Sequence, residues 1–162
     1  IPGLDAAQGE VFPVDYTIEG SDVGYRWFAR EGKAPRYWFG HGLSYSQFGY
    51  SALSLSGGKT LSAQVTVTNN GKVAGKEVVQ LYLTGTPAGP KRRLLGFSKL
   101  ALAPGESRTV TVDVDPRLVA DFDVKAHGWT IAKGRYEVGI GRDAGTMVLT
   151  GSAGLDAATL KP

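Results

Sequence analysis

The feature that most constrains the fold is a regular alternation of apolar and polar residues in the second part of the chain. In the run 61–69, Leu61, Ala63, Val65 and Val67 fall on one side, and Ser, Gln and Thr residues fall on the other. A period of two residues is typical of an antiparallel strand with one buried face. No helix-length period interrupts the later runs, which argues against a parallel α/β fold.

Similar runs recur to the end of the chain, separated by turn residues. The predicted strands are 50–56, 61–69, 77–84, 94–102, 108–115, 134–141 and 147–151, with a short pair at Phe122 and 129–132. Short strands at this spacing are typical of a β-sandwich. We therefore predict an all-β, antiparallel β-sandwich over residues 48–154, followed by a small polar tail at 155–162.

Several connections between these strands also carry predictions. Asn69-Asn-Gly-Lys72 is a strong turn signal, and 115–120 fits one helical turn that begins with Asp115 and Pro116. The Gly/Pro-rich run 84–90 predicts a loop, with the basic run 90–94 at its solvated edge. The glycines of 139–145 superficially resemble a dinucleotide-binding loop, but a strand-like run follows them, which favours a hairpin turn.

The first 47 residues look different. Prolines and glycines break them into short apolar patches, with short strand candidates at 14–18 and 23–28. Most of the aromatic residues, including two of the three Trp, lie within residues 12–50. A short arm cannot bury so many rings internally, so it needs another surface to pack on. We predict that residues 1–47 form an extended, aromatic-rich arm, with 36–45 as the hinge to the sandwich.

Composition excludes several classes of function. The net charge of +3 on 162 residues is too small and too scattered for a nucleic-acid binder. The absence of Cys and the presence of only two His argue against a zinc site, and no cofactor is expected. No apolar run approaches the roughly 20 residues of a membrane helix. No signal peptide is visible and the chain lacks a starting Met, so we expect a piece of something longer.

Catalytic residues are not predicted either. Carboxylates are numerous, but none sits in a pattern that would pair it with another across a sugar, as glycosidases require. The chain also lacks the Gly-x-Ser-x-Gly turn of many hydrolases.

A resemblance to a known family rests on several motifs in the same order. They are Glu19-Gly-Ser-Asp-Val-Gly-Tyr-Arg-Trp-Phe28, Phe39-Gly-His-Gly-Leu-Ser-Tyr45, Val65-Thr-Val-Thr-Asn-Asn-Gly71, Ala74-Gly-Lys-Glu-Val-Val-Gln-Leu-Tyr82, Leu95-Gly-Phe-Ser-Lys99, Leu102-Ala-Pro-Gly-Glu106 and Gly134-Arg-Tyr-Glu-Val138. Over about residues 10–154 the chain resembles the C-terminal part of glycoside hydrolase family 3 enzymes, of the β-glucosidase or β-xylosidase type.

The resemblance implies a fibronectin type III-like domain that belongs to a larger enzyme. In that family the active site lies between a (β/α)8 barrel and an α/β sandwich, which supply the nucleophile and the acid/base carboxylate. Neither of their motifs is present here. The resemblance therefore implies a non-catalytic segment that stabilises those two domains, in a parent that hydrolyses terminal β-glycosidic bonds, with β-glucosides as the expected substrates. Family members are often periplasmic or secreted.

By the same resemblance, the arm connects the α/β sandwich to this domain and runs across the enzyme. The predicted interdomain interface consists of Tyr25, Arg26, Trp27, Phe28, Trp38, Phe39, His41, Leu43 and Tyr45. His41 lies between two glycines and is a candidate either for a ligand contact or, as we favour, for a hydrogen bond within the joint. The alternative function is a carbohydrate- or surface-binding module, for which Trp129 and Tyr82 are the candidate aromatic platforms outside the arm. A self-sufficient enzyme has no support in the sequence.

Overall fold

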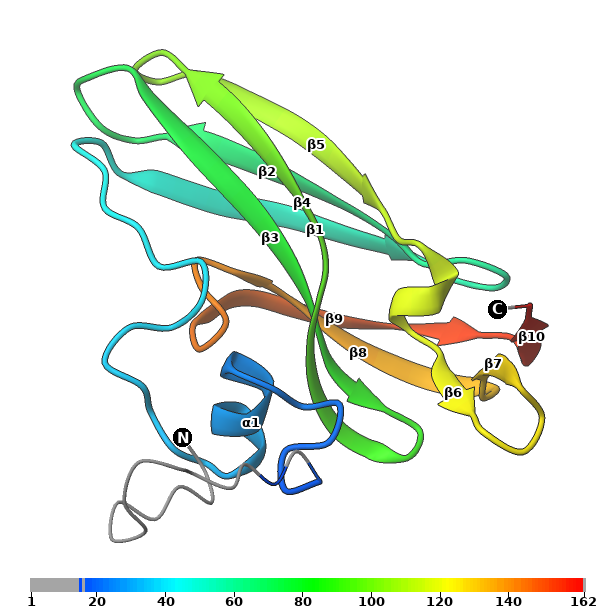
Figure 1. Ribbon diagram of the computed structural model, residues 1–162. Coiled ribbons are helices and arrows are strands. Elements are labelled where there is room, and N and C mark those ends of the chain that lie inside the picture. Colours follow the sequence, from blue (N-terminus) through cyan, green and yellow to red (C-terminus); the bar gives the residue numbers. More distant parts are fainter. Residues whose placement is uncertain (1–14, 16, 162) are drawn as a thin grey trace, which may run out of the picture.

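The computed structural model describes residue 15 and residues 17–161, and these form a β-sandwich (Figure 1). Its first sheet has the strand order β1 (Phe48–Ser56), β2 (Ser62–Asn69) and β5 (Ser107–Asp113). Its second sheet has the order β4 (Gly89–Leu102), β3 (Gly75–Thr86), β8 (Gly134–Gly141) and β9 (Met147–Leu155). Neighbouring strands in both sheets run antiparallel, so the predicted all-β, antiparallel β-sandwich is confirmed.

The core lies between the two sheets and follows the period-2 pattern. Val65 and Val67 of β2 are fully buried, and so are Val79, Leu81 and Leu83 of β3. Each fully buried aliphatic side chain contributes roughly 1.5–3 kcal/mol of hydrophobic stabilisation. The alternating apolar residues therefore fix which face of each strand points inward, as the sequence predicts.

A third, small sheet has the order β10 (Ala158–Leu160), β7 (Gly128–Ile131) and β6 (Asp121–Asp123). The predicted strand pair around Phe122 and Trp129 corresponds to β6 and β7. The predicted tail is not a plain tail, because Ala158–Leu160 pairs with β7 as β10. Three residues carry too short a pattern to predict a strand, and the pairing is set by the neighbour rather than by local propensity.

Short-range turn chemistry is confirmed at two places. The 3-10 helix η2 (Pro116–Leu118) begins as predicted, with the Asp115 carboxylate accepting a hydrogen bond from the Arg117 amide. Residues 142–146 form a hairpin turn between β8 and β9, and no helix follows it.

The predicted loop 84–90 and the loop position of the basic run are wrong. β3 continues to Thr86 and β4 begins at Gly89, so only Pro87 and Ala88 connect them. The basic run 90–94 therefore belongs to β4, and Arg93 is buried, where it donates to the carbonyl oxygens of Leu118 and Ala120. Pairing along the full length of β3 prevails over the local turn signals of the Gly and Pro residues.

The arm is not extended throughout. The predicted strand at 23–28 is wrong, because residues Tyr25–Arg30 form the α-helix α1. A helix of six residues is too short to show a 3.6-residue period, and its N-terminus at Gly24 has no side-chain cap that could signal it. The predicted strand at 14–18 falls partly outside the described residues, and residues 17–21 form a turn.

The division into residues 1–47, 48–154 and 155–162 stays a prediction. Within the described part of the chain, no helix is both long and apolar enough to span a membrane.

Candidate interdomain interface

Residues 17–47, here called the aromatic segment, precede β1 and contact the outer face of the four-stranded sheet (Figure 1). That face would otherwise expose the outward side chains of β3 and β4, among them Gln80, Tyr82 and Leu94. The aromatic segment contacts each of these residues.

Tyr25 of α1 makes the first attachment. Its hydroxyl accepts a hydrogen bond of 2.8 Å from the Leu94 amide of β4. Its ring stacks on Phe39 at 5.1 Å between centroids and meets the edge of Tyr82 at 6.2 Å. Three aromatic rings from distant parts of the sequence thus form one cluster, which ties α1 to the sheet.

Gln80 of β3 makes the second attachment. Its amide nitrogen donates to the carbonyl oxygens of Gly40 (3.2 Å) and Arg142 (2.9 Å), and its amide oxygen accepts from the Tyr82 hydroxyl (2.7 Å). A Cβ atom on Gly40 would lie 2.0 Å from the Gln80 amide oxygen, and Gly40 has a φ of +85°. Only glycine satisfies both conditions without displacement, so the backbone at residue 40 is fixed by this contact.

Ser46 makes the third attachment. Its hydroxyl oxygen lies 2.5 Å from the side-chain oxygen of Asn69, which is fully buried at the end of β2. The Asn69 amide nitrogen also donates to the carbonyl oxygens of Val73 and Leu102. The predicted turn at 69–72 therefore also holds the end of the aromatic segment.

Residues 41–45, here called the outer loop, connect the second and third attachments and are exposed along their whole length. Leu43 is 95% exposed and Tyr45 is fully exposed. Two apolar hollows flank the loop. One is lined by Leu43, Tyr45 and the ends of β3 and β4, and the other by Phe39, Val78, Leu94 and Phe97. Phe39 and Phe97 are 51% and 66% exposed, so apolar surface continues along this face.

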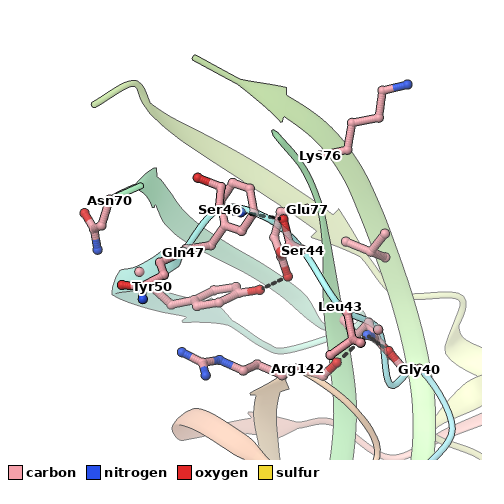
Figure 2. A pocket seen from close by; sticks show the side chains of 15 residues that line it. Gly40, Leu43, Ser44, Ser46, Gln47, Tyr50, Asn70, Lys76, Glu77 and Arg142 are labelled. Carbon is pink, nitrogen blue, oxygen red and sulfur yellow. Dashed lines mark hydrogen bonds between the residues drawn. The ribbon is translucent and has the colours of Figure 1, made fainter. Parts of the chain in front are cut away.

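A groove of about 720 Å³ opens between the outer loop, the start of β1 and the outward side of β3 (Figure 2). Inside it, the Tyr50 hydroxyl donates to the Glu77 carboxylate at 2.5 Å, and Arg142 lies beside this pair. Burial raises the pKa of Tyr50 above its ordinary value, and the hydrogen bond to Glu77 raises it further. The groove is lined by polar groups as well as by Leu43 and Phe48.

The other predicted interface residues are half-buried or exposed. Arg26, Trp27 and Phe28 are half-buried on α1, where the two rings meet edge to face at 5.3 Å. Trp38 is half-buried against Gly145 in the turn between β8 and β9. His41 is exposed, with Nδ1 3.7 Å from the Asp143 carboxylate and its ring 5.2 Å from that of Tyr37.

Among the nine predicted residues, two groups stand in contrast. Tyr25, Trp38 and Phe39 pack against the sheet or its turns, whereas Leu43 and Tyr45 contact little of this chain. Sequence reasoning missed Gln80, Asn69 and Ser46, which hold the segment in place. A polar residue at an outward strand position, such as Gln80, could have indicated a contact with the aromatic segment. The same pattern is equally typical of a solvated strand surface.

The alternative aromatic platforms are not exposed rings. Tyr82 is fully buried beneath the aromatic segment, and Trp129 is half-buried with Phe122 packed on it at 5.3 Å. Among the residues that the structure describes, no group of three or more His, Asp or Glu side chains lies close enough to hold a metal ion.

Comparisons with known proteins agree with this fold. Residues 77–144 match the family model of the fibronectin type III-like domain. The chain is 42% identical over 138 residues to the probable β-glucosidase K of Emericella nidulans. This alignment covers 82% of this chain and 16% of that protein. It is 40% identical over 149 residues to the thermostable β-glucosidase B of Acetivibrio thermocellus. This second alignment covers 87% of this chain and 20% of that protein.

Solved structures give the same result. The GH3 β-glucosidase of Bifidobacterium adolescentis aligns with a TM-score of 0.85 and 36% identity over 96% of this chain and 24% of its own. The β-glucosidase 3B of Thermotoga neapolitana, solved with α-D-glucose, aligns with a TM-score of 0.81 and 37% identity over 89% of this chain and 21% of its own. The chain therefore spans a quarter or less of each of these proteins. Residues 77–144 match a fibronectin type III-like domain, on a chain that is homologous to one part of glycoside hydrolase family 3 β-glucosidases.

Proposed function

We propose that this chain is the non-catalytic segment of a family 3 β-glucosidase, and that its aromatic segment docks on the catalytic part of that enzyme. The parent hydrolyses terminal β-glycosidic bonds, with β-glucosides as substrates. The catalytic part comprises a (β/α)8 barrel and an α/β sandwich, and this chain stabilises both. The size of the relatives supports the proposal, because each is several times longer than this chain.

One observation carries the proposal. The outer loop is held at Gly40 and at Ser46 by buried polar side chains, yet it presents Leu43 and Tyr45 almost completely to solvent. An exposed apolar pair on a fixed loop, next to two apolar hollows, is a typical binding surface. Burying the two side chains against a partner would contribute roughly 1.5–3 kcal/mol each.

The test compares the full-length enzyme with a double substitution, Leu43→Ser and Tyr45→Ser. Val124→Ser is the matched control, because Val124 is 72% exposed but lies in the turn between β6 and β7. We expect the double substitution to lower the melting temperature of the enzyme, with little change in kcat/KM at low temperature, and the control to change neither. An unchanged melting temperature with a large loss of kcat/KM would instead place the outer loop at the sugar site.

A further inference from the structure

A second surface of this chain is distinguished by positive charge and not by apolar side chains. A pocket of about 350 Å³ lies between α1 and the first part of β4. It is lined by the cationic side chains of Arg26, Arg30, Lys91 and Arg92 and, among the described residues, by a single carboxylate, that of Asp22. The pocket is separate from the outer loop and from the groove of Figure 2, which share no lining residue with it.

Two of the four cations already have carboxylate partners. Arg30 lies 3.4 Å from Asp22 and 3.3 Å from Glu31, and Lys91 pairs with Asp121. These pairs account for every carboxylate that contacts the pocket cations in the described part of the chain.

Arg26 and Arg92 have no such partner among the described residues. Arg26 donates one hydrogen bond of 3.3 Å to the Ser21 carbonyl oxygen, and its guanidinium lies 6.0 Å from the centre of the Tyr25 ring. Arg92 is half-buried, and its Nη1 atom is buried without a hydrogen-bond partner in residues 17–161. Burial lowers the pKa of the Arg92 guanidinium, but an arginine remains charged at neutral pH.

A desolvated and unpaired guanidinium is costly, and natural proteins compensate it with an anion. A carboxylate fits best, because the planar guanidinium fork binds the two oxygens of a carboxylate side by side. We propose that this pocket receives an Asp or Glu side chain from the catalytic part of the same enzyme. This inference rests on the proposed function, because it requires that part to dock here. It adds a charged contact to the apolar contact of the outer loop.

Zero-length cross-linking of the full-length enzyme tests this contact. Arg92→Lys introduces a primary amine at the pocket, and Arg26→Lys introduces one at a second position in case the first is out of reach. A carbodiimide activates a nearby carboxylate, the amine attacks it, and an amide forms as the carbodiimide leaves as a urea. Arg135→Lys is the control, because Arg135 is exposed on β8 and outside the pocket.

We expect mass spectrometry to find an amide between position 92 or 26 and an Asp or Glu of the catalytic part, absent from the control. Amides formed only to carboxylates within residues 1–162 would overturn the proposal, as would no new amide at either position. Stabilisation by inorganic phosphate that exceeds that by chloride at equal ionic strength, and is lost in Arg92→Gln, would also overturn it in favour of a free anion. If these results fail while the substitutions at Leu43 and Tyr45 still lower the melting temperature, the docking proposal stands and only the charged contact is lost.

Discussion

Within residues 39–46, the two ends and the middle make different kinds of contact. At the ends, Gly40 and Ser46 meet buried polar side chains of the sandwich, Gln80 and Asn69. In the middle, the apolar side chain of Leu43 meets almost no other residue of this chain. The same short loop therefore contains positions determined by the fold and positions that the fold leaves open.

This contrast separates residues whose contacts lie within this chain from residues whose contacts would have to come from outside it. Fixing a loop costs roughly 1–2 kcal/mol of conformational entropy per residue, so an ordered loop that buries nothing is not explained by its own contacts. The attachments at both ends hold the outer loop in one place, and its apolar residues then offer a preformed surface. Substitutions at the attached ends should therefore cost more stability within this chain than substitutions in the outer loop.

Gly40→Ala should produce the largest loss of stability. The added Cβ would collide with the Gln80 amide oxygen, and residue 40 would keep a positive φ. The backbone strain costs about 1–2 kcal/mol and each lost hydrogen bond about 1 kcal/mol, so we expect about 2–4 kcal/mol in total. Urea unfolding measures the change.

Gly42→Ala is the matched control for that substitution. Gly42 lies in the outer loop, and a Cβ there would meet no atom within 4 Å. We expect a change below about 0.5 kcal/mol, as for an ordinary surface position. Equal losses at the two glycines would remove the distinction between the attached ends and the outer loop.

Trp38→Ala should have an intermediate effect. The indole ring packs directly on Gly145, in the turn between β8 and β9, but it is only half-buried. Full truncation of a buried aromatic side chain costs about 3–5 kcal/mol, so a half-buried one should cost about 1–3 kcal/mol. In the full-length enzyme we expect a lower melting temperature and a smaller effect on transition-state binding. A large loss of kcat/KM at an unchanged melting temperature would contradict a structural role.

Tyr50→Phe tests the groove through its pH dependence. The folded state raises the pKa of Tyr50, chiefly by burial and then through Glu77, so the unfolded chain loses this proton at a lower pH. Stability from this group is therefore complete below about pH 10 and falls as the pH rises above it. Burial also raises the pKa of Tyr82 and of Tyr136.

The substitution should therefore make the alkaline loss of stability shallower without abolishing it. At neutral pH we expect a loss of about 1 kcal/mol, because the hydrogen bond to Glu77 is removed. Urea unfolding of both proteins between pH 7 and about pH 11 measures the two effects. Parallel stability curves would show that the Tyr50 proton does not contribute.

The strands could be predicted because their signal is local. In the middle of β2 (63–67) and of β3 (79–83) every second residue is apolar and buried, so the sequence itself specifies the inward face. The turn at 69–72 and the start of η2 were predictable for a related reason, because each begins with a side chain that accepts a hydrogen bond from a nearby amide. Asn69 accepts from the Gly71 amide, and Asp115 accepts from the Arg117 amide. Leu43 and Tyr45 were predicted at the interface because the family resemblance makes the arm an interdomain connection, and because the arm holds more aromatic rings than it can bury.

The remaining features depend on pairing across the sequence. β10 and the first part of β4 exist because β7 and β3 offer open edges to pair with, and no local pattern marks them. The attachment of Gly40 depends on Gln80, forty residues away, and on the Arg142 carbonyl oxygen. Residue types alone do not specify such contacts, whereas a positive φ at a glycine becomes informative once the backbone is known.

His41→Gln should have the smallest effect. The His41 ring is exposed, and its 3.7 Å distance to Asp143 is too long for a strong contact. The Asp143 carboxylate already accepts hydrogen bonds from the amides of Gly145 and Thr146, so it does not need the imidazole. Exposed ion pairs contribute about 0–1 kcal/mol, and we expect a change near the lower limit by urea unfolding of the 162-residue chain. The decisive comparison is with the full-length enzyme: a loss of stability there, but not in the chain, would mean that His41 contacts the docked partner. A loss of the same size in both would mean that His41 makes its contacts within this chain, as Gly40 does, and not with a docked partner, as we propose for Leu43.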